Sequence, residues 1–536
     1  MPTSQEPARP TGRRRRLARG IVLSVACLAL AAATGIAPDG RGPAAAQAAE
    51  AGRSGRPNVI VILADDLGHN DLSIAGNPLV RTPNIDSIGR QGVRFATGYA
   101  ADAVCAPSRA ALLTGRYPQR YGFEYLPYLP GFQSARDGTY GADRHKPMVL
   151  PLTPPPPEKN GLALSEVTLA EILKARGYRT GAVGKWHLGY DPKLTPTARG
   201  FDEFVGVLGG SSLYADQKDP DTASARLPWS GIDNYLWETR KAQIQKDGKT
   251  GPLPKYMTYA LADEAVGFVE RNRDRPFFLY LAFTAPHNPL QAPKAIYDRL
   301  DHIKDEKTRV YYAMIEAMDE AVGRVLAAVE QAGLADDTII IFTSDNGGAF
   351  YHEIPQENLP YRGWKTSYFE GGVNVPFLMR WNGRLPAGRT VPGVVSALDI
   401  VPTVASATGA RLPRDREFDG RDLLPVLTGT AANDLDGRTL VWRKEDYRAI
   451  RHGRWKLQTT KYPEAVWLHD LETDPTERIN LAARLPDKVR ELQALFAERE
   501  KAFAPPAWTP AARTRIDIDG YSPSAGDDVE HIYWTN

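Results

Sequence analysis

Continuous apolar runs alternate with helical patterns along most of this chain. Four runs are predicted to be buried strands of a parallel sheet, because such strands are apolar on both faces. They lie at residues 59–63, 179–183, 277–283 and 338–342. Helical periodicity covers residues 167–176 and 309–332, and Gly177 and Gly333 end these two patterns. The alternation predicts an α/β fold in which a large mixed, mostly parallel sheet is flanked by helices.

The pattern changes after about residue 419, where short strands follow one another before a final helix. The expected strands lie at 439–442, 447–452 and 455–459, and the helix lies at 485–503. We therefore predict a smaller α+β subdomain over residues 419–536 that contains a short antiparallel sheet. Two long stretches, 126–160 and 211–254, show no sustained periodicity and are predicted to be loops that select the substrate.

The first 48 residues have the pattern of an export signal. Arginines at 13–16 precede an apolar run at 20–33, and the small residues at 46–48 form a cleavage site. The run is shorter than the roughly 20 residues that a membrane span needs, and no second span follows. We expect an exported protein, periplasmic or secreted, and the arginine cluster also fits a twin-arginine route.

Charge excludes one class of partner. The 536 residues carry 66 Lys and Arg against 64 Asp and Glu, a formal net charge of +2. Cleavage after Ala48 removes seven arginines and two acidic residues, so that the mature chain has a net charge of about −3. Such a chain is not a general binder of polyanions, and no nucleic-acid partner is expected. Attraction to an anionic group must be local.

Polar residues follow the ends of the predicted strands, where open α/β sheets bind ligands. Asp65-Asp66 and Asp345-Asn346 supply three carboxylates and one amide oxygen. Oxygen ligands favour a hard cation, calcium first and magnesium second, whereas zinc prefers nitrogen and sulfur. The alternative is that these residues only cap turns. Lys185 and His187 alternate along an extended backbone, which would place both side chains on one face.

Cys105 is the only cysteine outside the export signal, because Cys27 lies in the signal's apolar run. A disulfide within the mature chain is therefore impossible. Cys105 begins the segment Cys-Ala-Pro-Ser-Arg, which has the pattern of a helix start and would attract anions. The thiol is a nucleophile, a residue destined for modification, or a small buried apolar side chain.

The segment from Cys105 to Arg116 reads C-x-P-S-R-x-x-x-L-T-G-R and resembles the signature of the sulfatase family. A second signature lies at residues 177–180 and 184–188, and the resemblance runs from about residue 58 into the 470s. It implies an alkaline-phosphatase-like fold with a catalytic sulfatase domain over residues 56–418. The implied activity is hydrolysis of sulfate monoesters of sugars or aryl alcohols.

The resemblance also implies a role for each site residue. A separate formylglycine-generating enzyme would oxidise Cys105 to formylglycine, and the hydrate of this aldehyde would attack sulfur. Arg109 would hold the modified residue, Lys185 and Lys365 would offset sulfate charge, and His187 and His287 would move protons. The implied metal ligands are Asp65, Asp66, Cys105, Asp345 and Asn346.

Two other functions remain open from the sequence. A phosphonate or phosphate monoester hydrolase of the same superfamily could share the fold and the aldehyde. A classical phosphatase fits less well, because histidine ligands for several zinc ions are lacking. A secreted glycan-binding protein without activity would result if Cys105 stayed unmodified.

Overall fold

The four predicted strands form the centre of a ten-stranded sheet. They are β1 (Asn58–Asp65), β4 (Arg179–Lys185), β9 (Phe277–Pro286) and β11 (Thr338–Ser344). Their order is β11-β1-β9-β4, and neighbouring strands are parallel. The computed structural model describes residues 56–129, 148–149, 154–520 and 529–535. The predicted export signal at 1–48 lies outside these described residues.

The outer strands make the sheet mixed, as the sequence predicts. The full order is β13-β2-β12-β11-β1-β9-β4-β5-β7-β8, and β12 runs antiparallel to both of its neighbours. A hairpin of β7 and β8 forms one edge. The bounds are β2 (Val93–Tyr99), β5 (Glu203–Val207), β7 (Gln243–Lys246), β8 (Lys249–Pro252), β12 (Phe377–Arg380) and β13 (Arg389–Ser396).

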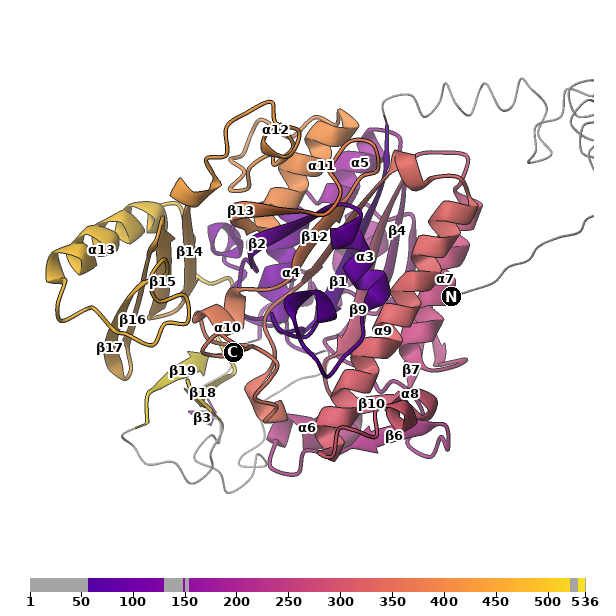
Figure 1. Cartoon of the computed structure of the whole chain (residues 1–536), viewed down its shortest axis with the longest axis horizontal. Coiled ribbons are helices and arrows are strands. Elements are labelled where there is room, and N and C mark those ends of the chain that lie inside the picture. Colours follow the sequence, from indigo (N-terminus) through magenta and orange to yellow (C-terminus); the bar gives the residue numbers. More distant parts are fainter. Residues whose placement is uncertain (1–55, 130–147, 150–153, 521–528, 536) are drawn as a thin grey trace, which may run out of the picture. The chain divides into compact units, whose positions relative to one another are not determined.

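Helices cover both faces of this sheet (Figure 1). Alternate residues of β1 point to opposite faces: Ile60 and Ile62 pack in one apolar cluster, and Val59 and Val61 in another. The first cluster contains residues of α3 (Pro83–Arg90), α7 (Met257–Arg271) and α9 (Glu306–Gln331). The second contains residues of α4 (Cys105–Thr114), α5 (Leu169–Ala175) and α11 (Ile400–Thr408). The predicted α/β fold is therefore confirmed.

The expectation of a loop at 211–254 is wrong for part of that stretch. It contains α6 (Gly231–Thr239), β6 (Thr222–Ala225) and the hairpin β7–β8, and β6 pairs with β10 (Leu290–Pro293). The helix α6 is short and buries only three side chains, so its periodicity is weak in the sequence. Of the stretch 126–160, residues 130–147 and 150–153 lie outside the described residues.

The C-terminal region contains the antiparallel sheet that the sequence predicts. Its strand order is β14-β15-β16-β17, and the strand β17 adds a fourth member to the three expected. The domain limits 56–418 and 419–536 stay a prediction. The bounds are β14 (Thr439–Lys444), β15 (Tyr447–His452), β16 (Trp455–Lys461), β17 (Glu464–Asp470) and α13 (Pro486–Glu500).

The remaining α-helices and β-strands of the described residues are short. A three-stranded sheet contains β3, β18 and β19. The bounds are β3 (Met148–Val149), β18 (Ala512–Asp517), β19 (His531–Thr535), α8 (Lys294–Arg299), α10 (Glu370–Val373) and α12 (Leu424–Leu427).

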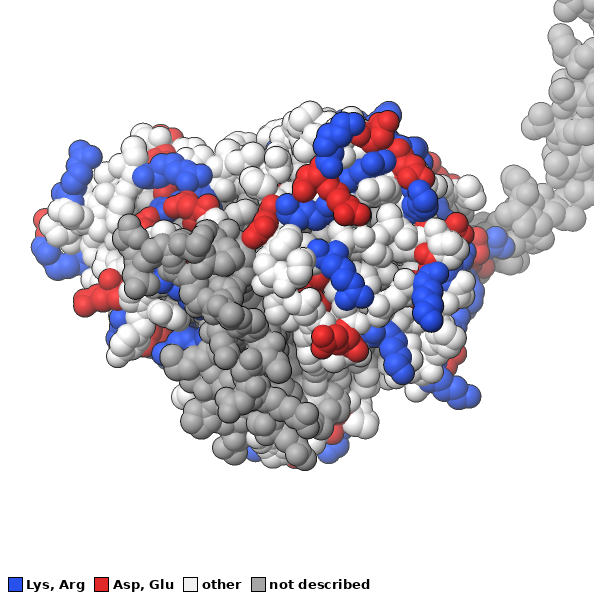
Figure 2. Space-filling model, turned by 90° about the horizontal axis from the view of Figure 1, so that it is seen from below, with Lys and Arg blue, Asp and Glu red and all other residues white. Residues whose placement is uncertain are grey.

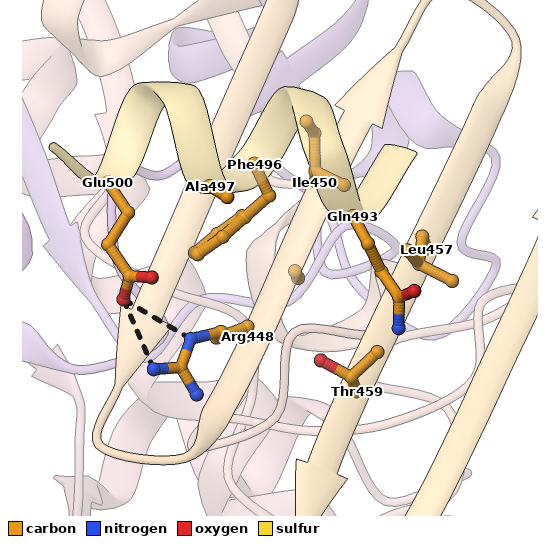
Figure 3. A pocket seen from close by; sticks show the side chains of 9 residues that line it. Arg448, Ile450, Leu457, Thr459, Gln493, Phe496, Ala497 and Glu500 are labelled. Carbon is orange, nitrogen blue, oxygen red and sulfur yellow. Dashed lines mark hydrogen bonds and ion pairs between the residues drawn. The ribbon is translucent and has the colours of Figure 1, made fainter. Parts of the chain in front are cut away.

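A cavity of about 260 Å³ lies between α13 and the strands β15 and β16. Figure 3 shows side chains of α13, among them Gln493 and Phe496, pointing toward these strands. At its edge, Arg448 donates a hydrogen bond to Glu500 over 3.2 Å. None of the predicted site residues lines this cavity.

Figure 2 shows basic and acidic side chains interspersed over one face of the molecule, where described residues are visible. This distribution agrees with the near-neutral formal charge. Over the part of the chain that the structure describes, no helix combines the length and apolar character that crossing a membrane requires.

Candidate active site

The carboxyl ends of adjacent central strands bring the predicted polar residues together. Asp65 ends β1, Lys185 ends β4, His287 follows β9, and Asp345 follows β11. Because parallel strands end at the same edge of a sheet, these side chains meet there. Six side chains at this edge are at most 1% exposed: Asp65, Asp66, Arg109, Lys185, Asp345 and Asn346.

Each of the three carboxylates is paired with a cationic side chain. The Nζ of Lys185 lies 2.7 and 2.9 Å from the two carboxylate oxygens of Asp65. The Nζ of Lys365 lies 2.7 Å from Oδ2 of Asp66.

The third pair joins Arg109 and Asp345. The Nε and Nη2 atoms of Arg109 lie 2.8 and 2.7 Å from Oδ2 of Asp345. Arg109 also donates to the main-chain oxygen of Lys185 over 3.0 Å. That Arg109 holds residue 105 stays a prediction.

The three pairs set the charge of the site. Three formal negative charges face three positive ones, so that a bound divalent cation would give the site a formal charge of +2 and a preference for an anionic ligand.

Asp66 and Asn346 contact each other at the predicted metal site. The Nδ2 of Asn346 donates to Oδ1 of Asp66 over 2.8 Å. The backbone of Asp66 is left-handed, with a φ of 64°, and its N–H donates to Oδ1 of Asp345 over 3.2 Å. The Oδ1 of Asn346 is buried without a hydrogen-bond partner among the described residues. A buried oxygen left without a donor, beside three carboxylates, fits a hard cation.

Cys105 begins α4 and is 2% exposed. One ligand atom from each of Asp65, Asp66, Cys105 and His287 lies within 4.8 Å of the others. The structure thus brings Cys105 into the group that the sequence assigns to a metal, and it adds His287 to that group. Burial raises the pKa of the Cys105 thiol to about 11, so the unmodified thiol is protonated at neutral pH.

The two adjacent aspartates differ in acidity. Burial raises the pKa of Asp65 to about 7, although Lys185 acts in the opposite direction. Burial also acts to raise the pKa of Asp66, but the positive charges of Lys365 and Lys185 outweigh it and lower that pKa. The site therefore keeps at least one firmly ionised carboxylate next to Lys365.

The two histidines have different surroundings. The Nδ1 of His287 lies 2.6 Å from the main-chain oxygen of Asn288, and its Nε2 lies 3.7 Å from Oδ2 of Asp66. The Nδ1 of His187 is buried and has no hydrogen-bond partner among the described residues. Burial, with nearby cations, lowers the pKa of both side chains well below the usual value. Both imidazoles are therefore neutral in the protein without substrate.

His187 does not continue the strand, which corrects the expectation that it shares a strand face with Lys185. Its backbone φ is 63°, in the left-handed region, and it lies beyond the end of β4. The ring instead packs against Gly210, where a Cβ would lie 2.6 Å from Cε1 of His187. Only glycine at position 210 leaves room for the imidazole.

Sequence reasoning missed four side chains that contact the site. Tyr351 donates to Oδ2 of Asp66 over 3.3 Å, and Tyr214 donates to the main-chain oxygen of His287 over 2.8 Å. Asn288 donates from Nδ2 to Oδ1 of Asp233 over 2.9 Å. Asn288 directly follows His287 and could have been found by that position. Tyr351 follows Asn346 by five residues, whereas Tyr214 and Asp233 come from distant parts of the sequence and carry no local signal.

Buried carboxylates, cations and histidines at the strand ends of an α/β sheet are typical of hydrolases that act on anionic esters. The family described as Sulfatase matches residues 57–410 of this chain. A second family, described as N-sulphoglucosamine sulphohydrolase, C-terminal, matches residues 363–499. The chain belongs to the sulfatase family and is a sulfuric ester hydrolase.

Three relatives illustrate the similarity. Steryl-sulfatase of Mus musculus is 36% identical over 448 residues, which cover 72% of this chain and 68% of that protein. N-acetylgalactosamine-6-sulfatase of Canis lupus familiaris is 33% identical over 410 residues, or 76% and 72% of the two chains. A crystal structure of Ps i-CgsB in complex with k-i-k-neocarrahexaose has a TM-score of 0.71 at 31% identity, and the match covers 84% of this chain and 94% of that one.

Proposed function

We propose that this sulfatase hydrolyses sulfate esters of carbohydrates, using a formylglycine made from Cys105 together with a bound Ca²⁺. The observation that carries the proposal is the buried group in which ligand atoms of Asp65, Asp66 and Cys105 lie within 4.8 Å of one another. A carbohydrate substrate is supported by Ps i-CgsB with its bound neocarrahexaose and by N-acetylgalactosamine-6-sulfatase. The steryl-sulfatase relative makes a steryl or aryl sulfate the alternative to be tested.

Together with residue 105, the residues that would hold the cation are Asp65, Asp66, Asp345 and Asn346. Their donors are carboxylate and amide oxygens, including the unpartnered Oδ1 of Asn346, and such oxygens favour Ca²⁺, with Mg²⁺ second. When both groups are present, the hydrated aldehyde supplies the nucleophilic oxygen and the cation supplies polarisation and positive charge.

The cationic side chains of this chain would stabilise the reacting sulfate. Lys185 and Lys365 place their ammonium groups at Asp65 and Asp66, beside Cys105. A sulfate bound there meets two buried positive charges, which favour the negative charge that grows on oxygen during the reaction. Arg109 keeps the third carboxylate, Asp345, in a fixed orientation.

Proton transfer is assigned to the two histidines. Because Nδ1 of His287 is directed at the main-chain oxygen of Asn288, only Nε2 is open to a substrate, and the negative charge of a bound sulfate ester favours the protonated ring. We assign this nitrogen to the protonation of the leaving alcohol oxygen. We assign to His187, whose buried Nδ1 has no hydrogen-bond partner among the described residues, the role of accepting a proton at residue 105.

The test combines mass analysis with a substrate panel. Peptides that contain position 105 should show an aldehyde in place of the thiol, and sulfate should be released from sulfated oligosaccharides. Aryl sulfate, aryl phosphate and an aryl phosphonate are assayed beside them. Faster turnover of the phosphorus esters would instead favour the phosphatase or phosphonate hydrolase. Glycan binding without turnover, by protein with a verified aldehyde, would support the inactive glycan-binding protein.

Export remains part of this proposal. It rests on the pattern of residues 1–48, and the mature chain should begin near residue 49. If a twin-arginine route exports the folded protein, the formylglycine-generating enzyme must act before export, in the cytoplasm. Determining the first residue of the purified protein, and locating it in fractionated cells, tests both points.

A further inference from the structure

We propose that Asp233 is a positioning residue, which holds the imidazole of His287 in its working orientation through the side chain of Asn288. The proposal rests on the leaving-group role given to His287 above. Asp233 lies on α6, outside the sequence motifs of the site, and its side chain is completely buried.

Asp233 is itself fixed by several bonds. Its Oδ2 accepts from the main-chain N–H of Leu227 over 2.9 Å and from Nε1 of Trp237 over 3.0 Å. Ser230 caps the helix by accepting from the main-chain N–H of Asp233 over 3.2 Å. The carboxylate is therefore held in one orientation, with Oδ1 left for Asn288.

Asn288 connects this carboxylate to the histidine. Its Nδ2 donates to Oδ1 of Asp233 over 2.9 Å, and it is 1% exposed. Its main-chain oxygen lies 2.6 Å from Nδ1 of His287, the preceding residue. A bond between neighbouring residues needs one particular backbone conformation, which the anchored side chain of Asn288 maintains. With Nδ1 donating, the ring presents Nε2 toward Asp66, at 3.7 Å from Oδ2.

A second contact holds the loop that carries His287. Tyr214 donates to the main-chain oxygens of Thr284 and His287, and so holds the same loop independently of Asp233. Loss of the contact between Asp233 and Asn288 should therefore leave the loop attached and mainly free the imidazole.

Three variants distinguish the hydrogen-bonded link to Asn288 from the negative charge of Asp233. Asp233→Ala and Asn288→Ala both remove the link. Asp233→Asn restores it in another form, because the new amide nitrogen can donate to Oδ1 of Asn288, which is buried and has no partner among the described residues. The matched control is Asp319→Asn. Asp319 is also buried, and it accepts from Nδ2 of Asn84 over 2.7 Å on a different pair of helices.

The measurements are kcat and KM for two substrates, a sulfated sugar with a poor leaving group and an activated aryl sulfate. We expect Asp233→Ala and Asn288→Ala to lower kcat on the sugar by about 10-fold or more, and on the aryl sulfate by less than about 3-fold, with little change in KM. Asp233→Asn should stay close to the parent protein. Asp319→Asn should show no difference between the substrates.

A readout without turnover uses nitrogen NMR of histidine-labelled protein, with His287→Ala to assign the signal. The Nδ1–H tautomer should dominate in the parent protein and lose its dominance in Asn288→Ala. Equal losses on both substrates, or an unchanged tautomer, would overturn the positioning role while the sulfatase function stands. A parent protein that carries the aldehyde but hydrolyses neither ester would overturn both proposals.

Discussion

Cys105 is buried where a thiol is a poor nucleophile. Its surroundings raise its pKa to about 11, and the thiolate is the reactive form of cysteine. The same surroundings suit an oxygen nucleophile, because Asp65, Asp66, Lys185 and Lys365 place charges of both signs beside it. The residue-scale arrangement therefore agrees with conversion of Cys105 to an aldehyde.

We expect Cys105→Ser, with the serine left unmodified, to complete no more than one turnover. A serine hydroxyl can attack sulfur and release the alcohol, but its carbon carries no second hydroxyl to expel the sulfate. Mass analysis after incubation with substrate should find sulfate attached at position 105, with alcohol released in at most equimolar amount. Sustained turnover by this variant would mean that the second hydroxyl of the aldehyde hydrate is not needed.

We expect Asp345→Ala to abolish metal binding and to lower the free energy of unfolding. Arg109 is fully buried and would lose the nearer of its two carboxylate partners, leaving Asp65 at 3.5 Å, and breaking a buried pair typically costs about 3 to 5 kcal/mol of unfolding free energy. Elemental analysis should show about one Ca²⁺ per chain in the parent protein and none in the variant. The control is Asp399→Ala, which breaks the buried pair with Arg438 and should lose similar stability but keep the metal. Stoichiometric zinc in the parent protein would contradict the oxygen-only ligand set.

At the scale of elements, a glycine ends α4 where the helix packs against α11. Gly115 stops this helix with a φ of 67°, and its N–H donates to the main-chain oxygen of Ala111 over 2.8 Å. A Cβ at this position would lie 2.8 Å from the Cβ of Val401 on α11. The helix that carries Cys105 is therefore packed tightly against α11 at its end.

We expect Gly115→Ala to lower the free energy of unfolding by about 2 to 4 kcal/mol, the sum of left-handed backbone strain and overpacking against α11. Gly333→Ala is a matched control, since Gly333 follows α9 with a φ of 68° and a Cβ there meets nothing within 4 Å. It should cost only about 1 to 2 kcal/mol. Urea unfolding of both variants gives the comparison. Equal losses would show that α4 and α11 adjust to the added methyl group.

The sequence predicts the central elements well because their signals are local. Apart from Arg179, every residue of the four central strands is buried, and the helical periodicity at 309–332 corresponds to the 26-residue helix α9. Asp65, Lys185, His287 and Asp345 lie at or just beyond the ends of those strands, so that one rule about strand ends places them, whereas Cys105 and Arg109 lie on α4. The helix α6 was not predicted, and the contact between Asp233 and Asn288 spans 55 residues, which no local pattern records. Such contacts exist only once the chain is folded.

At the scale of the whole molecule, the C-terminal sheet holds the segment that follows Lys365. The N–H of Tyr368 donates to the hydroxyl of Tyr447 over 2.8 Å, and the N–H of Glu370 donates to Oε2 of Glu477. Lys456 lies between two carboxylates, 2.6 Å from Glu370 and 3.2 Å from Glu477. These three charged side chains are almost fully buried. Because these contacts reach the segment that carries Lys365, the two sheets should unfold together in one transition.

We expect Lys456→Met to lower the unfolding free energy by about 3 to 5 kcal/mol, because two buried carboxylates lose their shared cation. Burial already raises the pKa of Glu477 to about 7, and loss of Lys456 raises it further. A carboxyl group whose pKa is higher in the folded than in the unfolded protein stabilises the fold at low pH. That stabilisation is lost as the pH rises above the unfolded pKa near 4.5.

The loss of unfolding free energy in Lys456→Met should therefore be larger at pH 8 than at pH 5, and urea unfolding at both pH values measures it. The control is Lys461→Met on the same strand, since Lys461 is exposed and its pair with Asp446 is worth about 1 kcal/mol or less. We also expect Lys456→Met to raise KM for sulfate esters, because the segment that carries Lys365 is less firmly held. A separate early transition, or a defect equal to that of Lys461→Met, would show that the C-terminal sheet does not support the site.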